Sequence, residues 1–159
     1  MRIAEIMTRN VRSVPPELSA QRAWSEMQRA RIHHLVVMER ARIVGIVSAR
    51  DLGGPRGAAI RGHRTVADLM TPQVVAAAPE TTVRKAAQLL RGRVIGCLPV
   101  VDGKQLVGIV TITDLLDLLG RGADRPAAES PPRSSKGGGA RKAAPPRVKP
   151  RPIQGSSRT

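Results

Sequence analysis

The sequence contains one structural unit written twice in an unbroken register. Met7-Thr8 recurs as Met70-Thr71, and the same spacing then holds to the end of the unit. Further identities keep that spacing: Val44 to Val47 with Val107 to Val110, Pro16-Glu17 with Pro79-Glu80, and Asp51-Leu52 with Asp114-Leu115. Chance does not preserve such a register, so the chain is expected to fold as two copies of one supersecondary unit.

Residue patterns predict the order β-α-β-β-α in each copy. Ser19 and Thr82 are the expected N-caps of the first helix, because hydroxyl side chains satisfy free N–H groups there. Apolar runs then predict a strand pair in each copy, and Asp102-Gly103 is a strong turn signal between the second pair. The predicted segments are extended pieces at 11–14 and 74–77, strands at 35–38, 43–47, 98–101 and 106–110, and last helices starting at 48 and 111.

Neither copy is expected to fold alone, because each has roughly 45 residues, near the lower limit for an independent core. We therefore predict an α/β fold in which the two sheets pack about a pseudo-twofold axis, leaving two related clefts. The boundaries are 1–58 for the first repeat and 59–122 for the second. In the first repeat, Gly53-Gly54-Pro55 is expected to cut the last helix short, and residues 53–64 to act as a linker.

Residues 123–159 differ in composition from the repeats. They are rich in Pro, Gly, Ser, Lys and Arg, and from Asp124 onward nine basic residues stand against two acidic ones. Such a segment buries too little apolar surface to offset its ordering entropy, so it is predicted to be a disordered basic tail. Its charge favours non-specific contact with nucleic acid, or it serves only to solubilise or link.

The compartment is expected to be the cytoplasm. Cys97 is the only cysteine, which excludes an internal disulfide and fits a reducing environment. The N-terminus lacks the apolar region of a signal peptide, and no run reaches the about 18 apolar residues that span a bilayer.

The residues with the most chemistry follow the second strand of each hairpin. Ser48 and Asp51, and Thr111 and Asp114, place a hydroxyl at a helix start and a carboxylate three residues later. Free N–H groups at a helix start attract anions, the hydroxyl can donate to phosphate, and a carboxylate can accept from both ribose hydroxyls. The same spacing is also a capping box that needs no ligand. Spacing alone leaves both interpretations open.

In combination, Met-Thr, Pro-Glu and Val-Gly-Ile-Val-(Ser/Thr)-x-x-Asp-Leu resemble the cystathionine β-synthase (CBS) domain, and the tandem pair resembles a Bateman module. The resemblance covers about residues 1–119. It implies a stand-alone regulatory module, not an enzyme, that binds an adenine nucleotide (AMP, ADP or ATP) or an adenosyl-containing ligand, with no catalytic cofactor. It also implies a homodimer and a separate effector protein. The competing hypotheses are a nucleic-acid- or ribosome-associated protein acting through the tail, and a dimerisation scaffold.

The resemblance also implies site residues. Contacts to phosphate and ribose are expected at Ser48, Arg50, Asp51, Thr111, Thr113 and Asp114, and contacts to the base at Val11, Val74, His34 and Cys97. The chain has no Phe or Tyr, so a base would sit among aliphatic side chains. Because Arg50 is a fixed cation where the second copy has Thr113, the two sites are expected to be unequal.

Four residues also have simpler interpretations. His33 and His34 are adjacent on a strand and point to opposite faces, so a metal site is not expected there. Cys97 is interpreted as a small core residue, and Trp24 as a core or interface residue.

Overall fold

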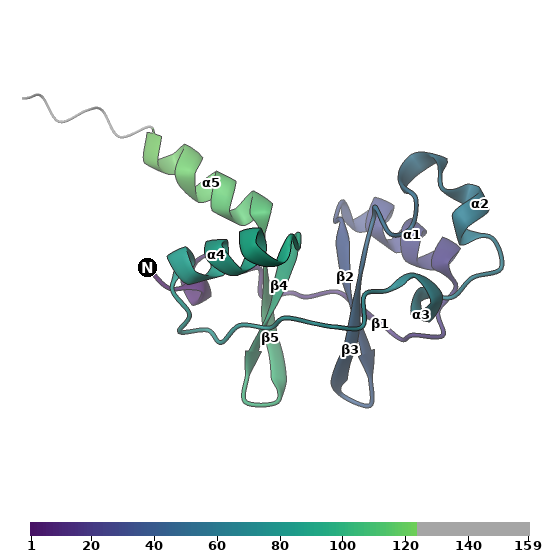
Figure 1. Ribbon diagram of the computed structural model, residues 1–159, viewed down its shortest axis with the longest axis horizontal. Helices are drawn as coiled ribbons and strands as arrows, with labels where there is room; N and C mark the ends of the chain where they lie inside the picture. Colours follow the sequence, from purple (N-terminus) through teal and green to yellow (C-terminus); the bar gives the residue numbers. More distant parts are fainter. Residues whose placement is uncertain (124–159) are drawn as a thin grey trace, which may run out of the picture. The chain divides into compact units, whose positions relative to one another are not determined.

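The computed structural model describes residues 1–123. The tail from residue 124 onward, with the disorder and nucleic-acid contact predicted for it, lies outside the described residues. Figure 1 shows two hairpins, each accompanied by helices. The elements are η1 (Ile3–Glu5), β1 (Ser13–Val14), α1 (Ala20–Ala30), β2 (His34–Glu39), β3 (Arg42–Ser48), η2 (Gly54–Arg56), α2 (Ala58–Arg61), α3 (Val66–Leu69), α4 (Val83–Arg93), β4 (Cys97–Asp102), β5 (Gln105–Thr111) and α5 (Ile112–Ala123).

Both predicted hairpins are confirmed. In the first repeat β1 pairs in parallel with β2, which pairs antiparallel with β3, giving the order β1-β2-β3. In the second repeat β4 and β5 form the equivalent antiparallel pair. The predicted extended piece at 74–77 is reduced there to one parallel bridge between Ala77 and Val100.

The predicted starts of α1 and α4 are also confirmed. Ser19 Oγ accepts a hydrogen bond from the Arg22 N–H at 3.3 Å, and Thr82 Oγ1 accepts one from the Lys85 N–H at 3.2 Å. Both helices end in a left-handed residue, Arg31 or Val94, each with φ of 54°. The two copies are therefore equivalent also in the residues that cap both ends of these helices.

The two repeats differ most after their second hairpin strand. The helix predicted to start at Ser48 is a single turn, because Gly53 and Gly54 have positive φ values of 77° and 60° and end it. Its counterpart after Thr111 continues as the 12-residue helix α5. The prediction that residues 53–64 are only a linker is wrong, because this segment folds into η2 and α2 and α2 contacts α1.

The segment that leads into each repeat packs on the other repeat. Ile3 and Met7 belong to the apolar cluster of the second repeat, and Val66, Leu69 and Met70 belong to that of the first. We call this the exchange of the leading segments, and backbone hydrogen bonds link the same partners. Thr8 and Ile109 form two hydrogen bonds of 3.0 and 2.9 Å, and Ile46 and Thr71 form two of 3.0 and 2.8 Å.

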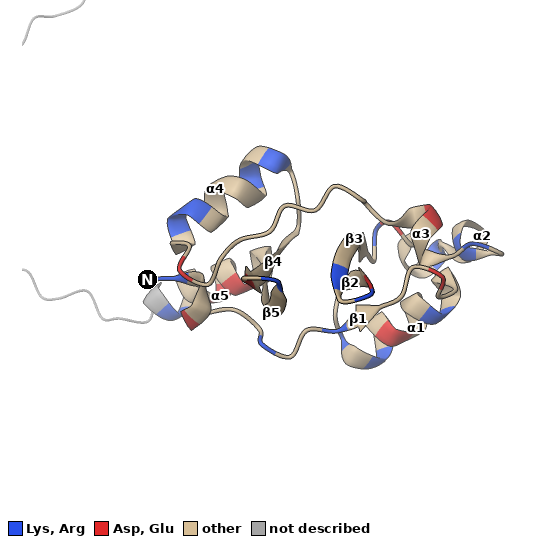
Figure 2. Cartoon of the chain, turned by 90° about the horizontal axis from the view of Figure 1, so that it is seen from below, with Lys and Arg blue, Asp and Glu red and all other residues tan. Residues whose placement is uncertain are grey.

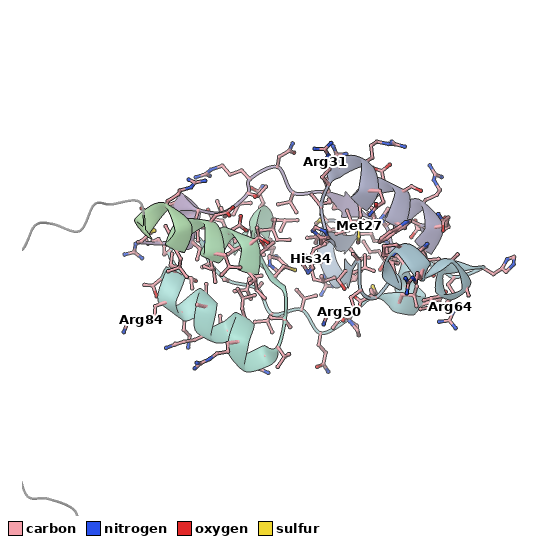
Figure 3. The ribbon with its side chains drawn as sticks, turned by 90° about the horizontal axis from the view of Figure 1, so that it is seen from above. Met27, Arg31, His34, Arg50, Arg64 and Arg84 are labelled. Atoms are coloured by element: carbon pink, nitrogen blue, oxygen red, sulfur yellow. The ribbon has the colours of Figure 1, made fainter. Side chains whose placement is uncertain are left out.

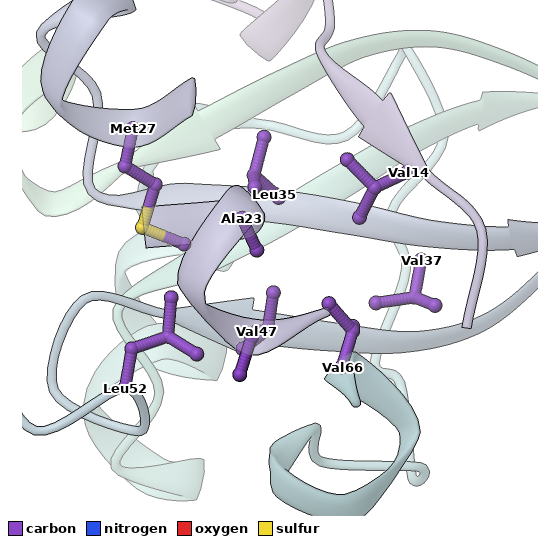
Figure 4. Packing of buried hydrophobic residues seen from close by; sticks show 9 residues of the cluster. Val14, Ala23, Met27, Leu35, Val37, Val47, Leu52 and Val66 are labelled. Atoms are coloured by element: carbon purple, nitrogen blue, oxygen red, sulfur yellow. The ribbon is translucent and has the colours of Figure 1, made fainter. Parts of the chain in front are cut away.

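Each repeat has its own core, and a third cluster joins the two sheets. Figure 4 shows the first core, in which Ala23 and Met27 of α1 pack on strand residues and on Val66 of α3. The joining cluster contains Val36 from β2 with Cys97 and Ile109 from β4 and β5. This cluster buries the faces that neither copy covers alone.

Charged side chains lie almost entirely on the outside of the described region. Figure 2 shows basic residues at both ends of α4, where Arg84, Lys85, Arg91 and Arg93 are exposed. Arg61 is the one buried charged side chain of residues 1–123. No helix in this part of the chain is long and apolar enough to cross a membrane.

Candidate functional site

The two hydroxyl–carboxylate motifs form the same hydrogen-bonded arrangement. Asp51 Oδ2 accepts from the Ser48 N–H and from Ser48 Oγ, both at 2.8 Å, and the Asp51 N–H donates to Ser48 Oγ at 3.1 Å. Asp114 Oδ2 accepts from the Thr111 N–H at 2.6 Å and from Thr111 Oγ1 at 2.8 Å. The capping box is therefore formed in both repeats.

This cap uses only one oxygen of each carboxylate. Both hydrogen bonds that the Asp51 carboxylate accepts, and both that the Asp114 carboxylate accepts, end on Oδ2, while Oδ1 accepts none from residues 1–123. Both residues are half-buried rather than enclosed. Because a carboxylate oxygen accepts up to two hydrogen bonds, the cap and a ribose contact are compatible.

Strand pairing places the first residue of each hairpin beside its motif. His34 is the cross-strand partner of Ser48, and Cys97 is that of Thr111. Burial, followed by the charge of His33, lowers the pKa of His34, and Asp51 acts in the opposite direction. Burial and then the charge of Asp51 raise the pKa of the Cys97 thiol from 9.0 to about 12. Cys97 is thus a protonated, buried thiol and a poor nucleophile.

His34 also touches the second repeat. A Cβ added at Gly96 would lie 2.7 Å from His34 Nε2, so the imidazole lies on the bare backbone beside Cys97. Val11 packs against the joining cluster that contains Cys97. The structure therefore brings His34, Val11 and Cys97 to the junction of the two sheets. Val74 is half-buried but belongs to none of the three apolar clusters of residues 1–123.

The two motifs differ at their third position. Arg50 is exposed in the turn after Ser48 and is labelled with His34 in Figure 3. Thr113 is exposed in the first turn of α5. One motif therefore carries an adjacent cation and the other does not.

The glycines of the repeated Val-Gly-Ile-Val segment have a structural role. A Cβ at Gly45 would lie 2.5 Å from Met70 Sδ and 3.1 Å from the Thr71 carbonyl oxygen, and a Cβ at Gly108 would overlap Met7 Sδ. Each glycine therefore receives the methionine of the exchanged leading segment. The space left by the missing side chain is filled by another part of the chain.

Two cavities lie elsewhere on the described region. One, of about 240 Å³, is lined by Arg12 to Pro15 and by α1 residues including Glu26. The other, of about 430 Å³, is lined by the start of α1 and by Arg61 and Arg64. Neither contains a residue of the two motifs. No group of three or more potential metal-ligating side chains occurs within residues 1–123.

Comparison with known families decides how the duplicated fold is classified. The family model described as "CBS domain" matches twice, over residues 3–52 and 66–121. The chain belongs to the CBS domain family. The matched ranges leave out the segment 53–65, which contains η2 and α2.

Relatives of this CBS domain pair include proteins of similar size. The CBS domain-containing protein YhcV of Bacillus subtilis is 32% identical over 114 residues, which cover 71% of this chain and 81% of YhcV. In longer relatives the similarity covers only a part of the relative's length. Homoserine O-acetyltransferase of Methanohalobium evestigatum is 28% identical over 119 residues, which are 74% of this chain and 24% of that protein.

Solved CBS domain pairs share the fold. The CBS domain pair of protein MJ0100, determined with 5′-methylthioadenosine and S-adenosyl-L-methionine, has a TM-score of 0.70 at 25% identity, covering 77% of this chain and 98% of that one. A putative signal-transduction protein with CBS domains from Burkholderia ambifaria has a TM-score of 0.71 at 25% identity, covering 82% and 100%. CBS pairs of this kind are regulatory modules.

Sequence reasoning missed the surroundings of Arg61. Nothing in the Gly-rich segment 53–64 distinguishes this arginine from the exposed basic residues around it. Its burial results from the packing of α2 on α1, and Trp24 of α1 lies 4.7 Å from its guanidinium carbon. Trp24, expected in the core or at an interface, is half-buried and packs against the first core.

Proposed function

We propose that this CBS domain pair binds an adenine nucleotide or an adenosyl-containing ligand at its Ser48 and Thr111 motifs and signals by a change of conformation or assembly. The supporting observation is the free Oδ1 of both Asp51 and Asp114 beside a helix or turn start. That oxygen accepts no hydrogen bond from residues 1–123, so a ribose hydroxyl can donate to it. The MJ0100 complex supports an adenosyl ligand as the first class to test.

The proposed contacts divide by chemistry. The motif hydroxyls and backbone N–H groups donate hydrogen bonds to phosphate, and the carboxylates accept hydrogen bonds from the ribose hydroxyls. Aliphatic residues with His34 and Cys97 meet the base. Arg50 favours a more highly charged ligand at the Ser48 motif than at the Thr111 motif, because only the former has an adjacent cation. No chemical step is assigned to either site.

Thermal unfolding tests this proposal with AMP, ADP, ATP and S-adenosylmethionine as probes. A ligand at a hundred times its dissociation constant adds about 2.7 kcal/mol to the free energy of unfolding. We expect Asp51→Ala or Asp114→Ala to abolish the ligand-induced shift and to cost about 1 kcal/mol through the lost cap.

Asp68→Ala is the matched control. Asp68 forms a capping box of the same geometry with Thr65, with Oδ2 accepting from the Thr65 N–H at 2.8 Å and from Thr65 Oγ1 at 3.1 Å, but lies outside the repeated motif. The Asp68→Ala variant should lose the stabilisation from its cap but keep the ligand-induced shift of the unfolding midpoint. If no probe shifts the wild-type midpoint, the motifs are helix caps only.

For assembly, we propose a homodimer through α5. Ile112, Leu116 and Leu119 are 48%, 59% and 70% exposed and lie at i, i+4 and i+7, on one helix face. An apolar stripe of this kind is typical of an interface. Leu116→Glu should convert a dimer to a monomer in sedimentation equilibrium, whereas Asp117→Ala, on the next position, should not.

A further inference from the structure

Arg61 is a buried cation held only by neutral groups. Its side chain is 4% exposed, its Nε donates to Gln21 Oε1 at 2.9 Å, and its Nη1 donates to the carbonyl oxygens of Leu52 and Gly54, both at 2.7 Å. Its guanidinium carbon also lies 4.7 Å from the centre of the Trp24 ring. Three hydrogen bonds and an aromatic face therefore fix its position.

The charge of this guanidinium has no carboxylate to balance it. Within residues 1–123 the ion pairs are those of Arg12 and Arg29 with Glu26, so no carboxylate lies within 4.0 Å of Arg61. Buried charges are normally paired, because desolvation without a counter-ion is costly. The segment packed on α1 thus contains a fixed, desolvated positive charge with no carboxylate partner among residues 1–123.

One nitrogen of Arg61 is left for such an anion. Nη2 donates no hydrogen bond within the described residues, and no side-chain nitrogen or oxygen buried there is without a partner, so Nη2 reaches the surface. Arg61 lines the cavity of about 430 Å³, together with Ser19, Gln21 and Arg64. Arg61, with its unused donors, therefore lines the same space as a second arginine.

Other features of this cavity also favour the binding of an anion. Ser19 and Gln21 belong to the start of α1, where the helix presents partial positive charge. Glu17 is the one acidic residue of the lining, against Arg61 and Arg64. Glu17 forms no ion pair with either arginine, so its carboxylate lies more than 4.0 Å from their nitrogens. An anion can therefore approach both arginines without displacing a carboxylate.

The second repeat does not reproduce this arrangement. In the repeat register Arg84 stands at the position of Gln21, and Ala87 at that of Trp24. The cavity is thus a property of the first repeat and of the segment 53–64, separate from the duplicated motifs. Its ligand should differ from theirs.

We propose that this cavity binds a tetrahedral oxyanion of the phosphate class. Arg61 Nη2 and the Arg64 guanidinium donate to its oxygens, as arginine donors do to phosphate, and Ser19 Oγ adds a third donor. The ligand is either free phosphate or the phosphate end of a small phosphomonoester. This inference goes beyond the proposed adenosyl site and does not depend on it.

Trp24 reports binding directly, because it is the only tryptophan and contacts Arg61. Inorganic phosphate is titrated into the full chain at ionic strength held constant with sodium chloride, and Trp24 fluorescence is followed. A saturable change is expected. Arg64→Met should raise the dissociation constant about fivefold, the effect of one largely exposed ion pair. Glu17→Gln should lower it, because it removes the one repelling carboxylate. If these residues had only a structural role, Glu17→Gln would not tighten the binding of phosphate.

Arg84→Met is the matched control, since Arg84 is an exposed arginine of the other repeat, on α4 rather than near Arg64 (Figure 3). It should leave the dissociation constant unchanged. No saturable change with phosphate, or equal weakening by Arg64→Met and Arg84→Met, overturns the proposal. Because Arg64 and Glu17 are both exposed, their substitution is not expected to disturb folding and obscure the result.

Glycerol phosphate distinguishes the two sources of the oxyanion. Tighter binding than inorganic phosphate, lost again in Arg64→Met, assigns the cavity to a small phosphomonoester. Equal or weaker binding assigns it to free phosphate.

Discussion

At the scale of single residues, Gly45 and Gly108 are required by the methionines that pack on them. A Cβ at Gly45 meets Met70 Sδ at 2.5 Å, and the neighbouring Thr71 carbonyl leaves little room to move. We predict that Gly45→Ala lowers the free energy of unfolding by about 1–3 kcal/mol, the usual effect of overpacking, as measured by urea denaturation.

The control for this prediction is Gly92→Ala. Gly92 is in α4 with nothing within 4 Å of an added Cβ, so alanine should raise stability by up to about 1 kcal/mol. Combining Gly45→Ala with Met70→Ala should cost less than the sum of the two single changes. Strict additivity would mean that the contact with Met70 is not the cause.

His34 predicts a pH dependence of stability. Burial lowers its pKa in the folded chain from the ordinary 6.5, so near pH 6 the unfolded chain binds more protons than the folded one. The stabilisation is therefore present above pH 6.5 and is lost as the pH falls below it. The unfolding midpoint should drop between pH 7.5 and pH 5.5, and His34→Gln should flatten that drop. In His63→Asn, a change at a surface histidine, the drop should persist.

The chemistry of the motif residues was predictable, but their surroundings were not. Serine or threonine three residues before aspartate fixes the capping box locally, so sequence alone gives the hydrogen bonds at Ser48 and Thr111. Which oxygen stays free depends on the fold. The partners of Gly45 and Gly108 are also distant in sequence, so their packing role was not evident.

At the scale of elements, the β2–β3 turn is less favourable than its counterpart. Arg40 and Ala41 both have positive φ, 47° and 61°, which costs energy for residues with a Cβ. The position of Arg40 is occupied in the second repeat by Gly103, with φ of 59°. Arg40→Gly should therefore stabilise the chain by about 0.5–1 kcal/mol in thermal unfolding.

Lys104→Gly tests whether that gain is specific to the backbone conformation. Lys104 stands at the position of Ala41 in the second repeat but has no positive φ, so glycine should bring only added freedom to the unfolded chain. It should be neutral or destabilising. A gain equal to that of Arg40→Gly would contradict the argument.

Elements with strong local signals were predicted correctly, and those without were not. Ser19 and Thr82 set the starts of α1 and α4, and alternating apolar runs set the hairpins. In contrast α2 has no side-chain cap and only four residues, and packing on α1 accompanies its formation. A Gly-rich segment gives no sign of such packing before the fold is known.

At the scale of the whole molecule, the exchange of leading segments couples the two repeats. The repeat pattern is the same whether Met7 and Met70 pack on their own repeat or on the other, so sequence periodicity could not predict the exchange. In the structure, Ile3 is fully buried in the second core, and Val66 is fully buried in the first. Each core is therefore completed by a residue from the segment that leads into the other repeat.

This coupling predicts that damage to one core is detected in the other. Ile3→Ala should lower the free energy of unfolding by about 2–5 kcal/mol, because it leaves a cavity in the second core. Trp24 packs on the first core, so its fluorescence reports that repeat alone, while far-ultraviolet circular dichroism reports both. If the exchanged segments and the joining cluster make the pair one cooperative unit, both signals should move to the same lower midpoint in Ile3→Ala. A Trp24 transition that stays at the wild-type midpoint would show instead that the repeats unfold independently.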